Sequence, residues 1–372
     1  MNTKHASGEV DKPKGKAKRL AELLWLCLFL ASVCALARQN AVPGAQTPAM
    51  SDDRITLDVV VRDKAGKPVS GMQQQDFTIL DNKQPQKILS FEAATSSSSP
   101  VEIVLVVDSV NTSFTNVAYE RTQIQKFLGR DGGRLAQPLS LAFFSDAGLA
   151  VPPVSSRDGN ALIVALNQNA TGLRSIRRSQ GFYGASDRSQ LSLDAIRELA
   201  EFAKSKPGRK IVIWVSPGWP MLSGANVQLS AKEQQNVFGT IVAISTELRQ
   251  SGIALYSVDP LGTADSVGYQ TSNYKQFLKG VRSPSQVYFG DLALQVLAYQ
   301  SGGRVLNSNN DVGGEIESCI RDASAYYVLS FDASPADGPD EYHTIQIKLD
   351  HPGLKAQTRS GYYAQPARPR TR

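Results

Sequence analysis

The apolar residues of this chain fall into short continuous runs that alternate with longer amphipathic stretches. Residues 101–107 hold six apolar side chains in seven positions and lead without alternation into Asp108. Residues 210–216 and 253–258 are similar, and such runs are typical of strands buried on both faces. The stretches 117–128, 191–204 and 232–250 carry apolar side chains at helical spacing. This order predicts an α/β fold with a doubly wound, mostly parallel sheet.

The two flanks of this region have a strand pattern without helices. Residues 55–62 alternate apolar and polar side chains, and short strands are expected near 77–82 and 88–91. Further strands are expected at 325–331, 344–349 and 356–363. An N-terminal β unit of about 40 residues is too small to bury a core by itself. We therefore expect the N- and C-terminal segments to form one small β-sandwich, with the α/β domain inserted into it.

The N-terminus has the pattern of a secretory signal peptide. A basic segment from Lys12 to Arg19 precedes an apolar run of about 15 residues that ends in Ala35-Leu-Ala37. This run is short for a membrane-spanning helix, which needs roughly 20 residues. Cleavage after it predicts a secreted, periplasmic or cell-envelope protein. The alternative is that the segment is not cleaved and stays as a membrane anchor. We expect membrane contact only in that case, and only through this segment.

These patterns give a full division of the chain. We expect a signal peptide at 1–37, a linker at 38–51, an N-terminal β unit at 52–93, a second linker at 94–100, an α/β domain at 101–324, C-terminal strands at 325–363 and a disordered tail at 364–372. Only Cys319 lies outside the signal, so no internal disulfide or cysteine metal site is expected. Its predicted role is that of a buried small apolar residue.

Charge and motifs exclude two classes of function. The net charge of +6 is concentrated at the two ends of the chain, with no basic stripe interleaved with aromatics, so no nucleic-acid partner is expected. The chain lacks a G-x-S-x-G, H-E-x-x-H, P-loop or G-x-G-x-x-G motif. Beyond the signal it has only two histidines, His343 and His351. We therefore predict that the protein is not an enzyme, with an undetected hydrolase as an alternative.

Small polar side chains follow the predicted central strands. Asp108, Asn111 and Thr112 follow the first, Ser216 follows another, and Asp259 ends a third. Ligands of open α/β sheets bind beyond the carboxyl ends of such strands. The same residue types also cap helices by accepting hydrogen bonds from free backbone N–H groups. Both interpretations stay open, with Asn111 or Thr112 as the expected cap of the helix that follows.

The layout resembles the von Willebrand factor A domain, over roughly residues 100–324. It is similar, more narrowly, to the acidobacterial family related to that domain, on residues 59–69, on Asp108-x-x-Asn111-Thr112 and on Ser360-Gly-Tyr-Tyr363. The resemblance implies a metal-ion-dependent adhesion site that opens with D-x-S-x-S. Here the first Ser position is Val110, and Ser216 stands where the family usually has Asp. The implied site is therefore degenerate, with Asp108, Thr112 and Ser216 as candidate ligands of a weakly held Mg²⁺ or other divalent cation.

The same loops form a candidate binding rim. It comprises Asn111, Asp259, Arg174, Arg177 and Trp219, because arginine and aromatic side chains carry most of the binding energy at interfaces. The arginines favour an acidic partner. The sequence thus predicts a non-catalytic binding or adhesion protein with an extracytoplasmic protein partner. The alternative is an envelope scaffold or assembly component that has no rim site.

Overall fold

The computed structural model describes residues 54–95, 98–169, 181–220, 228–261, 273–307 and 309–366. These belong to one compact unit, from Asp52 to Arg372. The predicted signal peptide, the first linker and the end of the tail lie outside the described residues, as do Arg174 and Arg177. In the part of the chain that is described, no helix combines the length and apolar character needed to cross a membrane.

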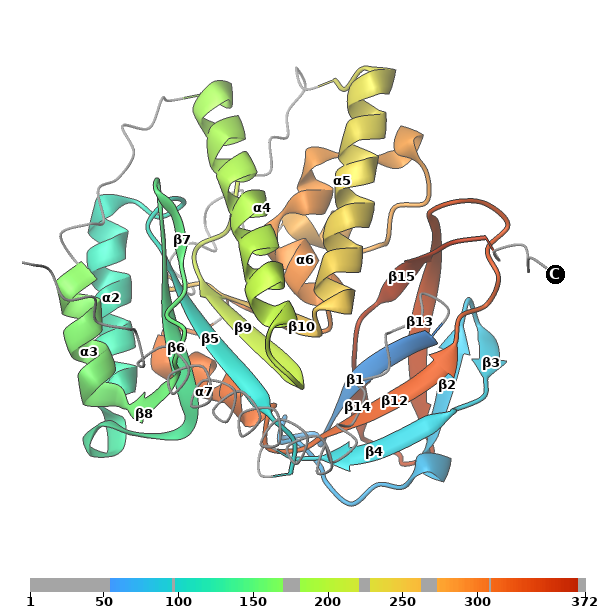
Figure 1. Ribbon diagram of the computed structural model, residues 1–372, viewed down its shortest axis with the longest axis horizontal. Coiled ribbons are helices and arrows are strands. Elements are labelled where there is room, and N and C mark those ends of the chain that lie inside the picture. The colour runs from blue at the N-terminus through green and yellow to red at the C-terminus, as the bar shows by residue number, and fades with distance from the viewer. Residues whose placement is uncertain are drawn as a thin grey trace, which may run out of the picture. The chain divides into compact units, whose positions relative to one another are not determined.

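A seven-stranded sheet forms the centre of the α/β region (Figure 1). Its path is β11-β10-β9-β5-β6-β7, and β8 pairs with β6. The strands are β5 (Val101–Asp108), β6 (Arg134–Ser145), β7 (Gly148–Ala150), β8 (Ser156–Asp158), β9 (Arg209–Val215), β10 (Ile253–Val258) and β11 (Val305–Leu306). The pairs among β11, β10, β9, β5 and β6 are parallel, whereas β7 and β8 are antiparallel to β6. The mostly parallel sheet that the apolar runs predict is confirmed.

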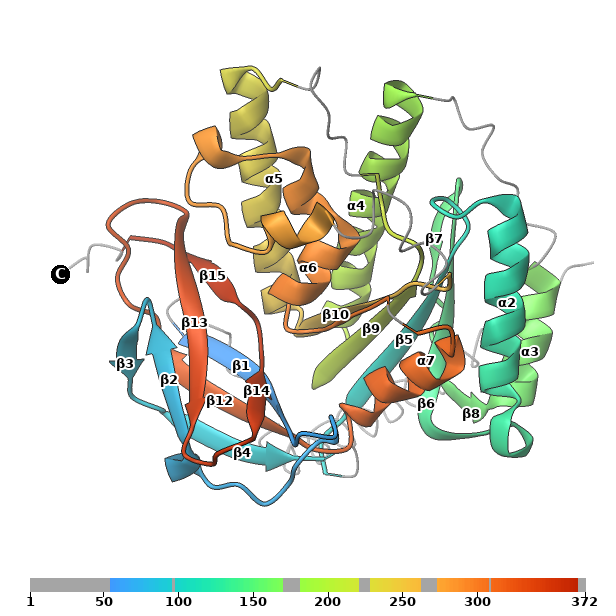
Figure 2. The same ribbon diagram turned by 180° about the vertical axis from the view of Figure 1, so that it is seen from behind.

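Helices cover both faces of this sheet, as the views from the front and from behind show (Figures 1 and 2). Val104 and Val106 of β5 belong to one apolar core with α4 (Phe182–Lys204), α5 (Ala231–Gln250) and α6 (Leu294–Gln300). The alternate residues Ile103, Leu105 and Val107 face a second core with α2 (Phe114–Leu128), α3 (Gly159–Gln168) and α7 (Val312–Arg321). Successive side chains of a strand point to opposite faces, so a run without alternation feeds both cores. Cys319 is buried in the second core, as expected.

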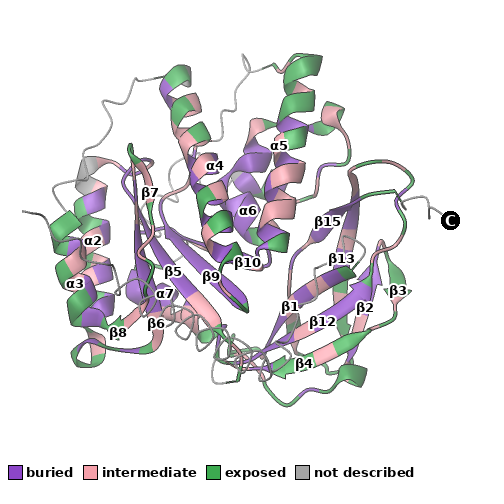
Figure 3. Ribbon diagram, in the orientation of Figure 1, coloured by how far each residue is buried: buried purple, intermediate pink, exposed green. Residues whose placement is uncertain are grey.

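The flanking segments pair with each other in two antiparallel sheets, of order β14-β1-β12-β4 and β15-β13-β2-β3. Their strands are β1 (Arg54–Arg62), β2 (Phe77–Asp81), β3 (Gln84–Gln86), β4 (Ser90–Ala94), β12 (Tyr326–Asp332), β13 (Glu341–Leu349), β14 (Lys355–Gln357) and β15 (Gly361–Ala364). Leu57 lies opposite Leu329, and Ile79 opposite Ile347. One apolar core lies between the sheets, and Figure 3 shows β2, β12 and β15 largely buried, whereas β3 and β4 are largely exposed. The division of the chain into separate domains stays a prediction.

Several helices begin earlier than the sequence pattern predicts. Helix α4 starts at Phe182, so residues 182–190 are helical although they lack an apolar period. Helix α7 starts at Val312, where the side chain of Asp311 accepts a hydrogen bond from the Gly314 amide. A helix that is anchored by its apolar turns extends through polar residues until a cap ends it, and periodicity alone cannot show this.

Candidate functional site

The expected strand-end residues meet at one edge of the central sheet. Val215 is paired with Val107 on one side and with Val258 on the other, so the next residues along the three strands lie side by side. These are Asp108, Ser216 and Asp259, and all three are buried. The Ser216 amide donates to the Val258 carbonyl at 2.9 Å, which continues the sheet by one further hydrogen bond.

The Asp108 carboxylate is saturated by donors from the protein itself. Oδ1 accepts the backbone N–H groups of Val110 at 2.8 Å and Asn111 at 2.9 Å. Oδ2 accepts the Asn111 side-chain amide and the Trp214 indole N–H, each at 2.9 Å. Burial raises the pKa of Asp108, and the hydrogen bonds from Asn111, Trp214 and Ser216 oppose that rise. Asp108 thus fixes its own loop and joins it to β9.

Asn111 extends this arrangement to the neighbouring helix. Its Nδ2 donates to Ser192 Oγ of α4 at 3.0 Å as well as to Asp108. Ser192 in turn donates to the carbonyl of Arg188. Asn111 is therefore a bridge between β5 and α4. The cap of α2 is Ser113, whose side chain accepts from the Asn116 amide, so the expected cap at Asn111 or Thr112 is corrected. The helix begins at Phe114, so the residue directly before it, Ser113, takes the capping position.

Val110 stands where the resemblance would place a hydroxyl ligand, and the structure places it in the core. It is buried in the apolar cluster that also contains Trp214 and Trp219. The two indole rings make an edge contact, with centroids 5.1 Å apart. Trp219 is only 4% exposed, so it packs beneath the rim instead of presenting a ring to solvent. Its proposed part in partner binding stays a prediction.

Sequence reasoning missed one acidic side chain at this site, Glu120 of α2. It is fully buried, and its pKa is raised well above the ordinary value, first by burial and then by the negative charge of Asp108. The Thr112 hydroxyl and the Asp108 backbone amide act in the opposite direction. Burial therefore favours the protonated form of Glu120. Its position three residues after Val117 and four before Ile124, on the apolar stripe of the helix, was the signal that it would be buried.

Asp259 has a similar local role at the end of β10. Its Oδ1 accepts the Leu261 amide at 2.9 Å. Its negative charge raises the pKa of both Glu120 and Glu315, although burial is the larger cause for each. Acidic groups this close disfavour each other's ionised forms. Burial and the neighbouring negative charges thus favour the protonated forms of Glu120 and Glu315.

The residues at this edge do not fit a divalent cation. A hard cation needs free oxygen lone pairs directed at one point. The four N–H groups that reach Asp108 instead direct positive hydrogens at its two oxygens. Among the described residues, no group of three or more His, Cys, Asp or Glu side chains could hold a metal. Ligation by Asp108, Thr112 and Ser216, as the resemblance implies, would require these internal hydrogen bonds to break.

The histidine that a hydrolase would use lies in the sandwich. His343 of β13 is buried, with Nδ1 3.0 Å from Asp81 Oδ1, and Tyr362 donates to Asp81 Oδ2 at 2.8 Å. His351 is exposed and lies 3.2 Å from Asp76. Within the described chain, the hydrogen-bond and ion-pair partners of these two rings include no serine or cysteine. Neither histidine is therefore positioned to act as the general base for a nucleophile.

No family model and no curated protein matches this chain. Among solved structures, the chain is similar to the human COPII-coat protein Sec24c, with 9% identity, a TM-score of 0.35 and coverage of 72% of this chain and 44% of that one. It is also similar to the manganese-loaded TRAP protein of Plasmodium vivax, with 10% identity, a TM-score of 0.34 and coverage of 76% and 100%. A third is the pilus adhesin SpaC of Lactobacillus rhamnosus GG, with 11% identity, a TM-score of 0.32 and coverage of 80% and 49%. The chain thus spans less than half of the first and third structures.

Proposed function

We propose that this protein is an exported, non-catalytic binding protein with a domain of the von Willebrand factor A type. It presents the loops after β5, β9 and β10 to a protein partner, and it does so without a bound cation. The observation that carries this proposal is the saturation of Asp108 by four N–H groups of its own chain. The position that implies a metal is used to hold the loops together.

A loop after β5 that is already held in place suits protein recognition. Association costs free energy for each loop that must become ordered, so loops fixed in advance bind more tightly. Asp108 and Asn111 fix the loop after β5 against β9 and α4 through side-chain hydrogen bonds. The cores on both faces of the sheet hold these elements in turn. The loop after β5 should therefore need little rearrangement on binding.

Tyr183 is the exposed anchor that we assign to this rim. It lies in the first turn of α4 and is 81% exposed. The same helix is tied to the rim loop by the bond from Asn111 to Ser192. Tyrosine is enriched at the residues that dominate binding energy, because it buries a large area and loses few rotamers. Tyr183 therefore replaces the buried Trp219 as the aromatic contact in this proposal.

Calorimetry tests the metal-free part of the proposal. Mg²⁺, Mn²⁺ and Ca²⁺ are titrated separately into the chain from residue 38 to 372, which the predicted cleavage would leave. We expect no binding isotherm and no rise in melting temperature with any of them. Saturable binding that disappears in Asp108→Ala, while the variant stays folded by circular dichroism, would show a working metal site and overturn this part.

A displayed random-peptide library tests the rim. Peptides are selected on the immobilised chain and then measured against two variants, Tyr183→Ala and Leu89→Ala. Leu89 is a partly exposed apolar residue of the sandwich, so it controls for the loss of a surface side chain. We expect Tyr183→Ala to weaken the selected peptides by about tenfold or more and Leu89→Ala to have little effect.

The burial of Asp108, Ser216 and Asp259 also favours a second candidate, an envelope scaffold that has no rim site. In a scaffold these side chains only brace the fold. It predicts that no peptide selected on the chain depends on Tyr183. That outcome would reject the rim as a binding site and favour the scaffold.

A further inference from the structure

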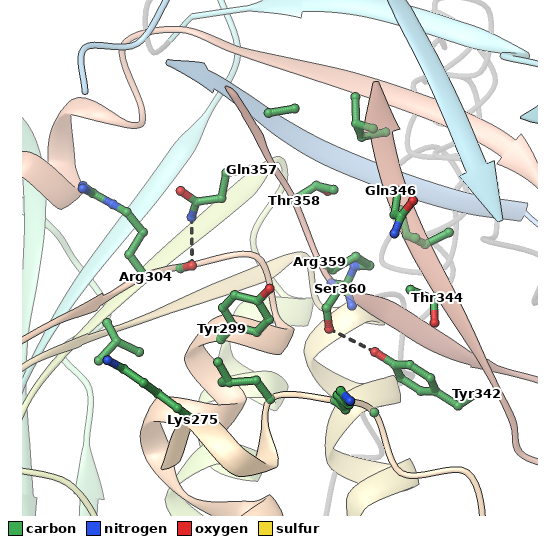
Figure 4. A pocket seen from close by; sticks show the side chains of 18 of the residues that line it. Lys275, Tyr299, Arg304, Tyr342, Thr344, Gln346, Gln357, Thr358, Arg359 and Ser360 are labelled. Atoms are coloured by element: carbon green, nitrogen blue, oxygen red, sulfur yellow. Dashed lines mark hydrogen bonds between the residues drawn. The ribbon is translucent and has the colours of Figure 1, made fainter. Parts of the chain in front are cut away.

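A groove lies between the C-terminal strands and the segment around α6. It has a volume of about 1200 Å³. One wall is β13 with the segment from β14 to β15, and the other is formed by η5 (Asn273–Phe277), the residues after it and the end of α6. Figure 4 shows the side chains of both walls pointing into this space. Small-molecule sites fill about 300–1000 Å³, so the groove suits a longer ligand.

The walls of this groove carry positive charge only. The basic lining residues are Lys275, Lys279, Arg282, Arg304, Lys348 and Arg359. None of the described residues that line the groove is acidic. Within the described ranges, Arg304 forms a direct ion pair, with Asp322 at 3.5 Å, and Arg359 is attracted by the charge of Asp58. A concave surface of one sign concentrates the field and attracts ligands of the opposite sign.

Arg359 is the strongest indication of a missing partner. It is only 8% exposed, and the structure shows no direct hydrogen bond or ion pair of its guanidinium with a described residue. Burial, and then the cation of Arg249, lower the pKa of Arg359 to about 10, while the negative charge of Asp58 opposes the fall, so it is still charged at neutral pH. A buried charge that is held only by a more distant carboxylate is costly, and an anion in the groove would offset part of that cost. The neighbouring Thr358 Oγ1 is buried without a partner in the same described set.

The groove also exposes a strand edge. β13 pairs with β15 only from Glu341 to Thr344, and the last hydrogen bond on that side joins the Ile345 amide to the Ser360 carbonyl at 2.9 Å. From there the chain leaves the β13 ladder, because β14 pairs with β1 of the other sheet, while β14 stays close to β13. The alternate residue Ile347 points its backbone groups to the same side, where no described strand pairs with it. Such an edge is a template for an added strand.

We propose that this groove binds an extended, acidic peptide segment of a partner protein, which adds as a strand to β13 and directs carboxylates to Arg359 and the surrounding lysines. In an extended peptide alternate side chains share a face, so alternate acids would line the basic wall together. Tyr299, which is 47% exposed in the same walls, offers apolar surface to the residues between them. The site is separate from the rim of the proposed function, and neither requires the other.

The charges make the chain's C-terminal tail a poor occupant of the groove. The tail carries Arg368, Arg370 and Arg372. It would be repelled by the basic walls. A single small anion would neutralise Arg359 but would leave the strand edge and most of the groove empty. An acidic polypeptide satisfies the charge, the length and the unpaired backbone groups together.

Fluorescence anisotropy with labelled dodecapeptides tests the proposal on the chain from residue 38 to 372. The probe alternates Glu and Val, and the comparison peptide alternates Gln and Val. We expect the acidic peptide to bind in a salt-sensitive manner and the neutral one at least about tenfold more weakly. Arg359→Met should weaken the acidic peptide by about tenfold or more, whereas Lys204→Gln, which removes a charge from α4 outside the groove, should not. Tyr183→Ala should also leave this binding unchanged.

Hydrogen exchange tests the strand addition. The acidic peptide should slow exchange of the Ile347 amide, and the neutral peptide should not. If Arg359→Met does not fold, the double variant Lys275→Gln/Lys348→Gln, which changes only exposed side chains, takes its place. Equal binding of the two peptides, or binding that ignores the groove variants, would overturn the proposal. Alginate, an acidic polysaccharide, is tested in the same way. If alginate binds in an Arg359-dependent manner and the acidic peptide does not bind, the assigned class of partner is overturned.

Discussion

The indole Nε1 of Trp214 donates a hydrogen bond of 2.9 Å to Oδ2 of Asp108 inside the apolar core of the α/β region. Trp214 comes from β9 and Asp108 ends β5, so the bond joins two neighbouring parallel strands at their carboxyl ends. It gives the carboxylate an internal donor at the edge where ligands of such sheets bind. The bond is one of the four N–H contacts that occupy the carboxylate and make it a poor ligand for a cation.

Replacing Trp214 by Phe should destabilise the protein more than the same change at Trp219. Both rings are buried and touch each other, so the loss of ring volume is similar. Only Trp214 donates to a carboxylate, whereas Trp219 Nε1 has no partner among the described residues. Hydrogen bonds to charged groups contribute about 1.5–3 kcal/mol, and Trp214→Phe should exceed Trp219→Phe by about that amount. Urea unfolding of the two variants measures the difference, and equal losses would contradict it.

Glu315 should make the protein less stable as the pH rises. Burial, and then the negative charges of Asp259 and Asp311, raise the pKa of Glu315 to about 7, while Arg304 opposes the rise. The folded protein therefore holds this proton more tightly than the unfolded chain. The contribution is fully present below about pH 4 and is lost as the pH rises through about 7. Glu315→Gln should raise the free energy of unfolding at pH 8 by about 1–3 kcal/mol and change it little at pH 4.

Thermal unfolding of Glu315→Gln across this pH range provides the measurement. Glu201→Gln is the matched control, because Glu201 is an exposed glutamate on another helix. The control should change stability by less than about 0.5 kcal/mol at either pH. A Glu315→Gln effect that is the same at pH 4 and pH 8 would show that its proton is not coupled to folding.

Asp322 should be the most sensitive residue at the contact between the sandwich and the central sheet. It accepts Arg62 of β1 and the Tyr256 hydroxyl of β10, and its backbone carbonyl accepts Arg209 of β9 at 2.8 Å. Asp322→Ala would leave buried cations without their acid, at a cost of about 3–5 kcal/mol. Asp332→Ala removes the acid of an exposed pair with Arg54 and should cost less than about 1 kcal/mol. Unfolding in guanidinium chloride compares the stability of the two variants. Similar losses of unfolding free energy would refute the role of Asp322.

Much of the framework could be predicted from local sequence. The strand at residues 253–258 has the expected bounds, and Val101–Asp108 is a central strand of the sheet. These predictions succeed because a continuous apolar run fits only an element that is covered on both faces. Helix starts were less well predicted, since α4 gains two polar turns that carry no period. Glu120 was missed because a buried acid on an apolar stripe is recognised only through its neighbours.

The sequence by itself determined that Asp108 ends a central strand and that Val110 removes a hydroxyl from the loop after it. It also determined that the flanking strands needed one another to bury a core. Only the tertiary structure decided which donors occupy Asp108, because Trp214 lies 106 residues away in the chain. It also decided that six basic residues from separate segments line one groove, with Arg359 buried among them. Burial and charge depend on long-range packing, and local patterns specify the elements without specifying these contacts.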